Sequence, residues 1–322
     1  MEFESADMNL DRPTLADLRH SLDGRLADSL AERFGKLDIS FLSQANDVAD
    51  GTTVLLLSDA AGQSRAVVLC AAPAAPEMVQ RAMLHARQAK MSLGPSLGAP
   101  ILEPLMEGLV QGLSFAVLPF CKGLSSIRPV WWMQRALIRP PGLEWLWRAT
   151  ERTVRDVEPA DVERSFAAPL REIASLKVLS DRVRAAALRA AERLRGGEWK
   201  PRYVLMHADF WKGNILIRPR QDAGEMRKWR DRLVIIDWAG SELNGYAIFD
   251  LIRISQSLRL NPRGLRSEVG RHCQLLQCGV TDAMSYLLAA LGHIAMHLEY
   301  FPVDAYVRMA DSCFATLEEI LD

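Results

Sequence analysis

Apolar and polar positions follow a strand-like pattern in the first 120 residues of the chain. Short apolar runs stand between segments rich in Gly, Ser, Asp and Pro, which is typical of β-strands joined by turns. An amphipathic helix is predicted over 14–34, where leucines recur at three- and four-residue spacing before Gly35. The predicted strands are 52–57, 66–70, 99–105 and 114–120, with a helix over 76–90 that is broken at Gly94-Pro95.

Most of the chain after Leu124 has helical spacing instead. Two apolar segments interrupt it, over 204–216 and 233–238, and each surrounds polar residues. The clearest predicted helices are 142–157 and 175–195, and two further helices are predicted near 282–300 and 304–321. A set of strands followed by a set of helices predicts an α+β fold with two parts.

Composition narrows the class of protein. The chain has 322 residues, of which 49% are hydrophobic and 25% charged, with a formal net charge of −1. These values are typical of a globular protein, and no apolar run approaches the ~20 residues that span a bilayer. The first residues are acidic and lack an apolar core, so we expect a cytoplasmic location. Without a recognition motif or an overall basic charge, we expect no nucleic-acid partner.

Cysteine and tryptophan each allow a structural and a functional interpretation. The five cysteines are scattered, which favours buried free thiols over a disulfide framework or a zinc site. Trp131, Trp132, Trp145 and Trp147 form a group that could mark a membrane interface or a ligand-stacking surface. Packing between helices is the commoner explanation for such a group, so a membrane partner is not expected.

The segment that carries chemistry begins at His207. A strand-like run ends in His207-Ala-Asp209, Asn214 follows five residues after Asp209, and another apolar run ends in Asp237. Asp209, Asn214 and Asp237 therefore stand at the ends of neighbouring β-segments, which hairpin geometry can bring together. Phosphoryl transfer needs such a group: one carboxylate for the attacking hydroxyl, and a second carboxylate with an amide oxygen for magnesium.

HADFWKGN resembles the H-x-D-x-x-x-x-N catalytic loop of aminoglycoside phosphotransferases and choline kinases, and IIDW resembles their metal-binding segment. The resemblance is close over about 200–255 and elsewhere extends only to the order of elements. It implies a two-lobed, protein-kinase-like fold. A small N-lobe, 1–121, would hold a five-stranded antiparallel sheet with one packed helix, and a larger, mainly helical C-lobe would span 122–322.

The resemblance also assigns roles to residues. It implies Asp209 as the catalytic base, and Asn214 and Asp237 as magnesium ligands beside ATP. His207 and Asp250 would hold the loop in place. Beyond the resemblance, Lys212 either reaches the transferred phosphate or faces solvent.

The linker that follows the last predicted strand is the expected place for adenine. By element order, the backbone groups of Pro119, Phe120 and Cys121 would bind it. The acceptor would be a small molecule with a hydroxyl group. Residues 233–322 carry 11 acidic and 6 basic side chains, an excess that permits a cationic acceptor such as an amino sugar or amino alcohol.

The N-terminal part departs from the pattern that the resemblance implies. Cys70 is expected where the phosphate-binding lysine would stand, and the following helix has no glutamate to pair with it. The segment 41–54 is expected to cover the phosphates, but it contains a single glycine, Gly51, where several would be expected. Losing both partners of an ion pair avoids the cost of leaving one charge unpaired.

Two interpretations remain open at this point, and a third is kept beside them. The chain is an active kinase that uses another cation, for which Arg65, Arg81, Arg87 and Lys90 are the candidates. Alternatively, it is a pseudokinase-like binding or scaffolding module. The complete set of Asp209, Asn214 and Asp237 favours the active kinase. The third class is a membrane-associated enzyme that acts on a lipid head group, prompted by the tryptophan group.

Overall fold

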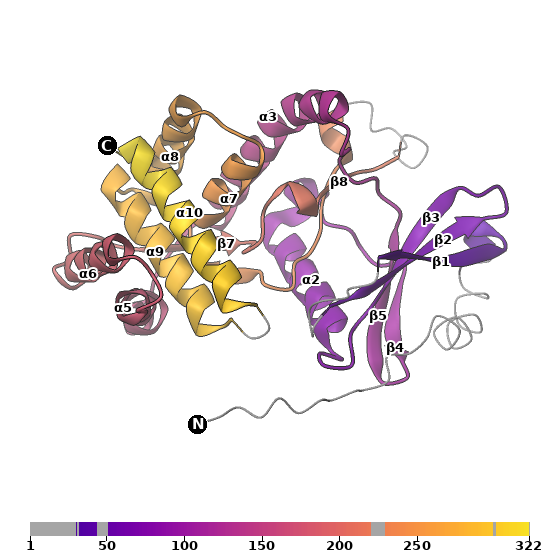
Figure 1. The fold of residues 1–322 in the computed structure, drawn as a ribbon, viewed down its shortest axis with the longest axis horizontal. Coiled ribbons are helices and arrows are strands. Elements are labelled where there is room, and N and C mark those ends of the chain that lie inside the picture. Colours follow the sequence, from indigo (N-terminus) through magenta and orange to yellow (C-terminus); the bar gives the residue numbers. More distant parts are fainter. Residues whose placement is uncertain (1–29, 31, 44–50, 220–228, 299–300, 322) are drawn as a thin grey trace. The chain divides into compact units, whose positions relative to one another are not determined.

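The structure is a computed structural model, and it describes residues 30, 32–43, 51–219, 229–298 and 301–321. The chain divides into two compact units, shown along the ribbon in Figure 1. The first consists of residues up to Leu84 together with Glu103–Phe120, and the second consists of His85–Leu102 and Cys121–Asp322. Helix α2 (Met78–Leu97) therefore contributes to both units.

The first unit is built on a five-stranded antiparallel sheet in the order β1-β2-β3-β5-β4. This confirms the five strands expected from the resemblance, although the sequence patterns had marked only four. The strands are β1 (Leu37–Ser43), β2 (Thr53–Asp59), β3 (Ser64–Cys70), β4 (Met106–Val110) and β5 (Leu113–Pro119).

The turn between β2 and β3 is held by Asp59, which confirms the predicted hairpin. One carboxylate oxygen accepts the N–H groups of Ala61 and Gln63, each at 2.9 Å, and the other pairs with Arg65 at 2.7 Å. Gly62 supplies the positive φ of the turn, 73°. These contacts lower the pKa of Asp59, the Gln63 N–H bond most of all.

The prediction of a strand over 99–105 was wrong. Residues 106–110 form β4, joined to β5 by a two-residue turn in which Gln111 and Gly112 both have positive φ, 50° and 79°. Such a turn closes a tight antiparallel hairpin, so the glycine-rich segment is mostly strand rather than loop. Within 99–105, Ile101 makes a single β-bridge to Ile235, and both residues belong to the second unit.

The second unit is mainly helical, with short strands that position the polar motif (Figure 1). Its sheets are β10-β7-β6 and β8-β9. The strands are β6 (Arg155–Asp156), β7 (Arg202–Met206), β8 (Ile215–Ile217), β9 (Leu233–Ile235) and β10 (Glu242–Gly245). The helices are α3 (Arg128–Thr153), α4 (Pro159–Val162), α5 (Ala168–Ser175), α6 (Asp181–Arg195), α7 (Phe249–Ser257), α8 (Pro262–Leu276), α9 (Val280–Met296) and α10 (Val303–Leu321).

Helix α9 forms the centre of this unit, because its residues 285–292 are buried around the whole circumference. Beside it an aromatic cluster packs around Phe166, whose ring lies 5.2–6.4 Å from those of Trp199, Tyr203, Tyr246 and Tyr286. Aromatic pairs at these separations add to the apolar packing that holds the helices together.

Helix boundaries differ from the prediction where proline is tolerated. Helix α3 begins at Arg128, well before the predicted start, and continues through Pro140 and Pro141 because Ile138 and Leu143 are buried on either side. In helix α2 the predicted break at Gly94-Pro95 is confirmed, because Gly94 has a non-helical φ of 75° and the helix is kinked there. The predicted helix over 175–195 is α6, preceded by the separate α5. The predicted helices over 282–300 and 304–321 correspond to α9 and α10.

Substituting Gly292 with alanine should destabilise the fold. A β-carbon there would lie 2.0 Å from the Pro169 carbonyl oxygen, so the backbones of α9 and α5 would have to separate. We expect a loss of about 3 kcal/mol or more in the free energy of unfolding. Gly270→Ala is the matched control, because nothing lies within 4 Å and alanine should stabilise that helix by up to about 1 kcal/mol. Urea unfolding measures both, and equal midpoints would contradict the close approach.

The predictions on cysteines and on residues near the N-terminus have different outcomes. All five cysteines are free thiols, four of them buried and Cys278 half-buried, which confirms the interpretation of scattered buried thiols. The predicted helix over 14–34 lies mostly outside the described residues. In the described part of the chain, no single helix is long and apolar enough to cross a membrane, and only the bent pair α8 and α9 meets that length and composition together.

Candidate active site

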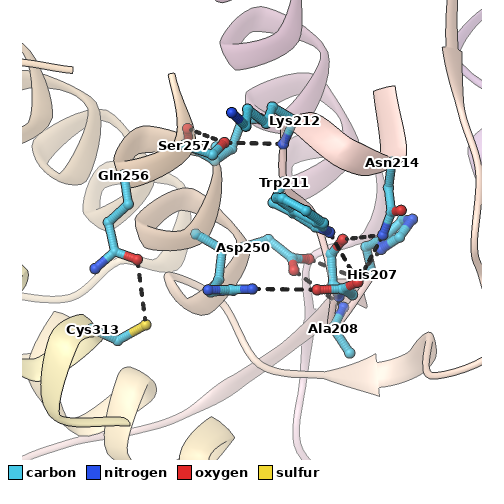
Figure 2. Close-up of polar contacts among 12 residues, drawn as sticks. His207, Ala208, Trp211, Lys212, Asn214, Asp250, Gln256, Ser257 and Cys313 are labelled. Carbon is cyan, nitrogen blue, oxygen red and sulfur yellow. Dashed lines mark hydrogen bonds and ion pairs between the residues drawn. The ribbon is translucent and has the colours of Figure 1, made fainter. Parts of the chain in front are cut away.

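The segment His207–Asn214, called the catalytic loop below, follows β7 and lies beside α7 within the second unit (Figure 2). Asp250 anchors its first residues. One carboxylate oxygen of Asp250 accepts the His207 N–H at 2.6 Å, and the other accepts the Ala208 N–H at 3.1 Å. These bonds hold Ala208 at a φ of 70°, a conformation that a residue with a side chain rarely adopts.

The environment of Asp250 acts on its pKa in two opposite directions. Burial raises the pKa to about 7, while the two backbone N–H donors lower it. Ile248, just before α7, also has a positive φ of 75°, unusual for a β-branched residue. Strained backbone of this kind gathers at functional sites, where the surrounding packing over-determines it.

His207 joins the catalytic loop to the end of β9. Its ring Nε2 donates to the Ile236 carbonyl at 3.0 Å, and its Nδ1 accepts the N–H of Asp209 at 3.3 Å. Both contacts fit one neutral tautomer. Burial lowers the pKa of His207 to about 4, so the ring stays neutral near pH 7.

Two aromatic rings pack against the ring of His207. The His207 ring lies 4.5 Å from that of Trp238 and 5.8 Å from that of Phe210, measured between centroids. Trp145 contacts both Trp238 and Phe210, and its indole N–H donates to the Leu97 carbonyl at 2.8 Å. Trp145 therefore belongs to the core, which confirms the packing explanation for this member of the tryptophan group.

Asp209 presents a carboxylate that is fixed on both oxygens and is still reachable by solvent. Its Oδ2 accepts from Asn214 Nδ2 at 2.8 Å and from the Trp211 indole N–H at 3.2 Å. Its Oδ1 lies 3.4 Å from the Arg253 guanidinium, and the side chain is 46% exposed. A carboxylate oriented in this way can accept a proton from a bound hydroxyl group.

Asn214 and Asp237 lie at the same end of the β8–β9 hairpin. Asn214 Nδ2 donates to both the carbonyl and the carboxylate of Asp209, at 2.9 and 2.8 Å, which leaves its amide Oδ1 as an acceptor. The Ile236 N–H donates to the Asn214 carbonyl at 3.0 Å, so Asp237 follows directly, exposed and with a φ of 67°. An amide oxygen and a carboxylate are ligands that magnesium accepts.

The donor set fits magnesium and does not fit a dedicated transition-metal site. Among the described residues, no group of three or more His, Cys, Asp or Glu side chains lies together as metal ligands do. Magnesium typically takes one or two protein carboxylates and completes its shell with water and phosphate oxygens. Asn214 and Asp237 could hold the ion in that manner.

One face of α7 supports the whole loop, and Asp250 is the residue of that face that the sequence motif indicates. Asp250 binds the loop's first N–H groups, Arg253 approaches Asp209, and the Ser257 hydroxyl accepts the Lys212 N–H at 3.1 Å. These three positions recur at helical spacing, so a helix over 249–257 would have placed them on one face. Helical periodicity around Asp250 was therefore the available signal for Arg253.

Lys212 does not point at the carboxylate of Asp209 in this arrangement. Its ammonium lies over the ring of Trp131, 5.0 Å from the centroid, and the side chain is exposed. Such a cation–π contact favours a defined lysine position outside the loop's interior. In Figure 2 the Lys212 side chain extends away from Asn214.

The predicted adenine partners offer fewer donors than expected. The Phe120 N–H donates to the Arg65 carbonyl at 3.0 Å, which extends the β3–β5 pairing by one residue. Proline has no N–H, so Pro119 and Phe120 could present only carbonyl oxygens to a nucleotide. The Cys121 side chain is buried.

The placement of Cys70 at the lysine position was wrong, because Cys70 faces the other side of the sheet. Cys70 pairs with Phe115, and both belong to the apolar core of the first unit. Leu69 pairs with Ala116, on the same face as Ser114, whose hydroxyl donates to the Pro76 carbonyl at 2.6 Å beside α2. An apolar residue, Leu69, therefore stands on the face toward α2 at this end of β3.

The candidate replacement cations lie in separate places. Arg65 is paired with Asp59 in the β2–β3 turn, at the opposite end of β3 from Cys70. Arg81 is exposed on α2, with its guanidinium 3.3 Å from the Met78 sulfur. Arg87 and Lys90 are half-buried in the part of α2 that belongs to the second unit. Most of the segment before Gly51 lies outside the described residues.

By sequence, neither the protein-family models nor the curated proteins give a match. By structure, the chain is similar to a thermostable mutant of aminoglycoside phosphotransferase APH(4)-Ia in its apo form. The two share 16% identity and a TM-score of 0.50, over 90% of this chain and 98% of the other. A ternary complex of a thermostable mutant of the same enzyme with ADP and hygromycin B has 15% sequence identity and a TM-score of 0.51, over 90% of this chain and 96% of the other. A putative fructosamine-3-kinase from Haemophilus somnus 129PT has 12% sequence identity and a TM-score of 0.51, over 92% of this chain and 97% of the other.

This likeness extends over nearly the full length of both chains, so it concerns the whole fold rather than one motif. The chain has the two-lobed α+β fold of small-molecule kinases of the aminoglycoside phosphotransferase type. The resemblance carried by HADFWKGN and IIDW is thereby confirmed at the level of the fold. At these identities the likeness leaves the roles of individual residues as proposals.

Proposed function

We propose that this chain is a phosphotransferase that moves the γ-phosphoryl group of ATP to a hydroxyl group of a small molecule. The observation that carries the proposal is the joint placement of Asp209, Asn214 and Asp237 by one network of hydrogen bonds. His207 connects the loop to Ile236, which precedes Asp237, and Asn214 connects Asp209 to the β8–β9 hairpin. The fold of known small-molecule kinases supports the same reaction class.

Asp209 would act as the base in this reaction. Its carboxylate would accept the hydroxyl proton of the acceptor while the oxygen attacks phosphorus in line with the leaving group. The Asn214 amide and the Trp211 indole fix one oxygen, and Arg253 lies near the other. Orientation by three donors lowers the cost of placing the carboxylate for proton transfer.

Asn214 and Asp237 would hold magnesium through oxygen atoms. When bound, the magnesium nucleotide supplies the phosphoryl group and neutralises charge on it. The chain's own contribution is to keep both side chains at the end of one hairpin, Asp237 through its positive φ and Asn214 through its bonds to Asp209. Asn214 is also largely buried, which keeps its amide from rotating freely.

We propose a small molecule with a hydroxyl group as the acceptor. A complex of one structural neighbour contains ADP and hygromycin B, and another neighbour is described as a fructosamine-3-kinase. The acidic excess of residues 233–322 is compatible with a cationic acceptor, such as an amino sugar or amino alcohol.

A pseudokinase-like binding module is the second candidate, and a specific observation favours it. On the described part of β3, the residues that face α2 are the apolar Val67 and Leu69, and Arg65 is already paired with Asp59. The first unit therefore lacks the usual lysine for nucleotide phosphates. Such a module would retain the fold and bind a ligand without turnover.

Nucleotide binding separates the two candidates. The kinase should gain thermal stability with ATP and magnesium together, because a ligand that binds only the folded state stabilises it by mass action. We expect Asp237→Asn to need about tenfold more magnesium for the same shift, since asparagine tolerates the positive φ but removes a charge. Differential scanning fluorimetry measures both chains. No shift of the parent at millimolar ATP and magnesium would overturn the enzyme proposal.

A further inference from the structure

The first three turns of α3, residues 128–140, carry apolar side chains on their solvent-exposed face. Trp132, Met133 and Leu137 are 55%, 59% and 42% exposed, and Ile127 just before the helix is 63% exposed. Ala136 and Pro140 lie between them on the same exposed side. A helix of a globular protein normally places charged or polar residues there. We call this surface the α3 apolar face.

The opposite side of the same turns is apolar because it packs in the protein core. Ile138 is 1% exposed and packs in the core of the second unit, with Trp131 against it. These turns are therefore apolar on both sides, a pattern typical of a helix that is covered from both directions. Within the described residues the outer side has no such cover.

Positive charge flanks the α3 apolar face along one edge. Arg128, Arg135 and Arg139 recur at seven- and four-residue spacing, which places them in one row along the helix. No Asp or Glu occurs between Glu107 and Glu144 in the sequence. The face thus combines tryptophan, aliphatic side chains and a row of arginines without a compensating acid on its own segment.

We propose that the α3 apolar face docks on an anionic membrane surface, with the helix lying in the plane of the lipid head groups. Helices of this kind insert tryptophan and aliphatic side chains at the acyl boundary, and arginines bind the negative head groups. The tryptophan ring is suited to this depth because it is apolar with one polar N–H. This proposal departs from the expectation from sequence that a membrane partner is unlikely.

A second copy of the chain fits the same face less well. A twofold axis through Trp132 would place the arginine rows of two antiparallel helices side by side, and like charges repel at such an interface. No carboxylate of the segment 108–143 is available to separate them. Charge complementarity therefore favours an anionic lipid surface.

The face lies on the helix that contacts the catalytic loop. Trp131, one residue before Trp132, carries the Lys212 ammonium on its ring. Trp131 packs on the inner side of α3, so the loop lies on the side of the helix away from the docking face. The docking proposal does not depend on phosphotransfer, because it rests on the exposure and charge of α3 alone.

Vesicle co-sedimentation of the full chain tests the proposal. We expect binding to vesicles of phosphatidylcholine mixed with phosphatidylglycerol to exceed binding to phosphatidylcholine alone by about tenfold or more, and to weaken as salt rises. The double variant Trp132→Gln with Leu137→Gln should reduce binding about tenfold, since it removes the inserting side chains. The control Leu188→Gln with Val178→Gln replaces equally exposed apolar residues elsewhere and should bind like the parent.

Two results would overturn the docking proposal. One is a parent chain that sediments equally with and without vesicles at low salt. The other is a parent that elutes as a dimer while the Trp132→Gln, Leu137→Gln variant elutes as a monomer, without vesicle binding by either. Thermal melts of the variants show that they fold. The ATP and magnesium shift is measured separately, so failure of docking and failure of nucleotide binding are distinguishable.

Discussion

Replacing Asp209 with asparagine should reduce turnover by about 10²–10⁴-fold, the usual contribution of a positioned general base. Asparagine has nearly the same shape, so an amide oxygen can still accept from the Asn214 amide and the Trp211 indole. What it loses is the ability to take up a proton from the attacking hydroxyl. ADP release from ATP in the presence of magnesium measures the change.

A matched variant separates loss of the base from a general effect of removing a carboxylate. Asp304→Asn makes the same chemical change at an exposed position on α10 and should retain turnover. The Asp209→Asn chain should also keep the thermal shift with ATP and magnesium, because Asn214 and Asp237 are unchanged. Turnover of Asp209→Asn close to that of the parent would refute the role of Asp209 as base.

Removing the Asp250 carboxylate should cause a large loss of stability for a single side chain. In Asp250→Ala, the N–H groups of His207 and Ala208 lose their buried acceptors, which are 2.6 and 3.1 Å away in the parent. Each unpaired buried group costs about 1–3 kcal/mol, so we expect a total of about 2–5 kcal/mol. Urea unfolding measures it, and a cost below about 1 kcal/mol would contradict the anchoring role.

The Asp250→Asn variant tests the direction in which the contribution of Asp250 to stability changes with pH. Burial raises the pKa of Asp250 to about 7, so this carboxyl contributes its full stability below the unfolded pKa of 3.8 and loses it as the pH rises through 7. Asparagine does not titrate. The cost of the substitution should therefore be smaller at about pH 8 than at about pH 5, by about 2–3 kcal/mol.

His207 should show the opposite dependence in both chains and so cancel from that comparison. Its pKa is lowered to about 4, so its contribution is full above an unfolded value of 6.5 and is lost as the pH falls toward 4. A cost of Asp250→Asn that grows with pH would mean that the carboxylate is held ionised by its two N–H donors.

The elements that sequence predicted well are those with a local signal. The β2–β3 hairpin has a turn that Asp59 closes by itself, and helix α10 repeats apolar positions along a single face. The strand at 99–105 failed because its apolar residues resemble a strand, whereas the tight turn at Gln111-Gly112 moved the pairing to 106–110. The predicted helix was shorter than α3 because two prolines are typical of a helix boundary in sequence, whereas here they lie within the helix beside buried neighbours.

The candidate site was predictable as far as its spacing in sequence allows. His207, Asp209, Asn214 and Asp237 are named by a motif whose residues stand within about one hairpin of each other. Arg253 and Ser257 were missed because their role depends on the direction in which α7 presents one face. The face of β3 was misjudged for a related reason, since a shift of one residue moves a side chain to the other side of a sheet.

The sequence by itself determined which groups the candidate site can offer: a carboxylate and an amide in the catalytic loop, and a second carboxylate, Asp237, after β9, together with a β3 strand that contains no lysine. Only the tertiary structure decided which residue faces α2, that Arg253 approaches Asp209, and that Trp145 is core while Trp132 is exposed. Residue type and spacing fix which groups a segment can offer. Burial and orientation arise from contacts between segments far apart in the chain, and no local pattern encodes them.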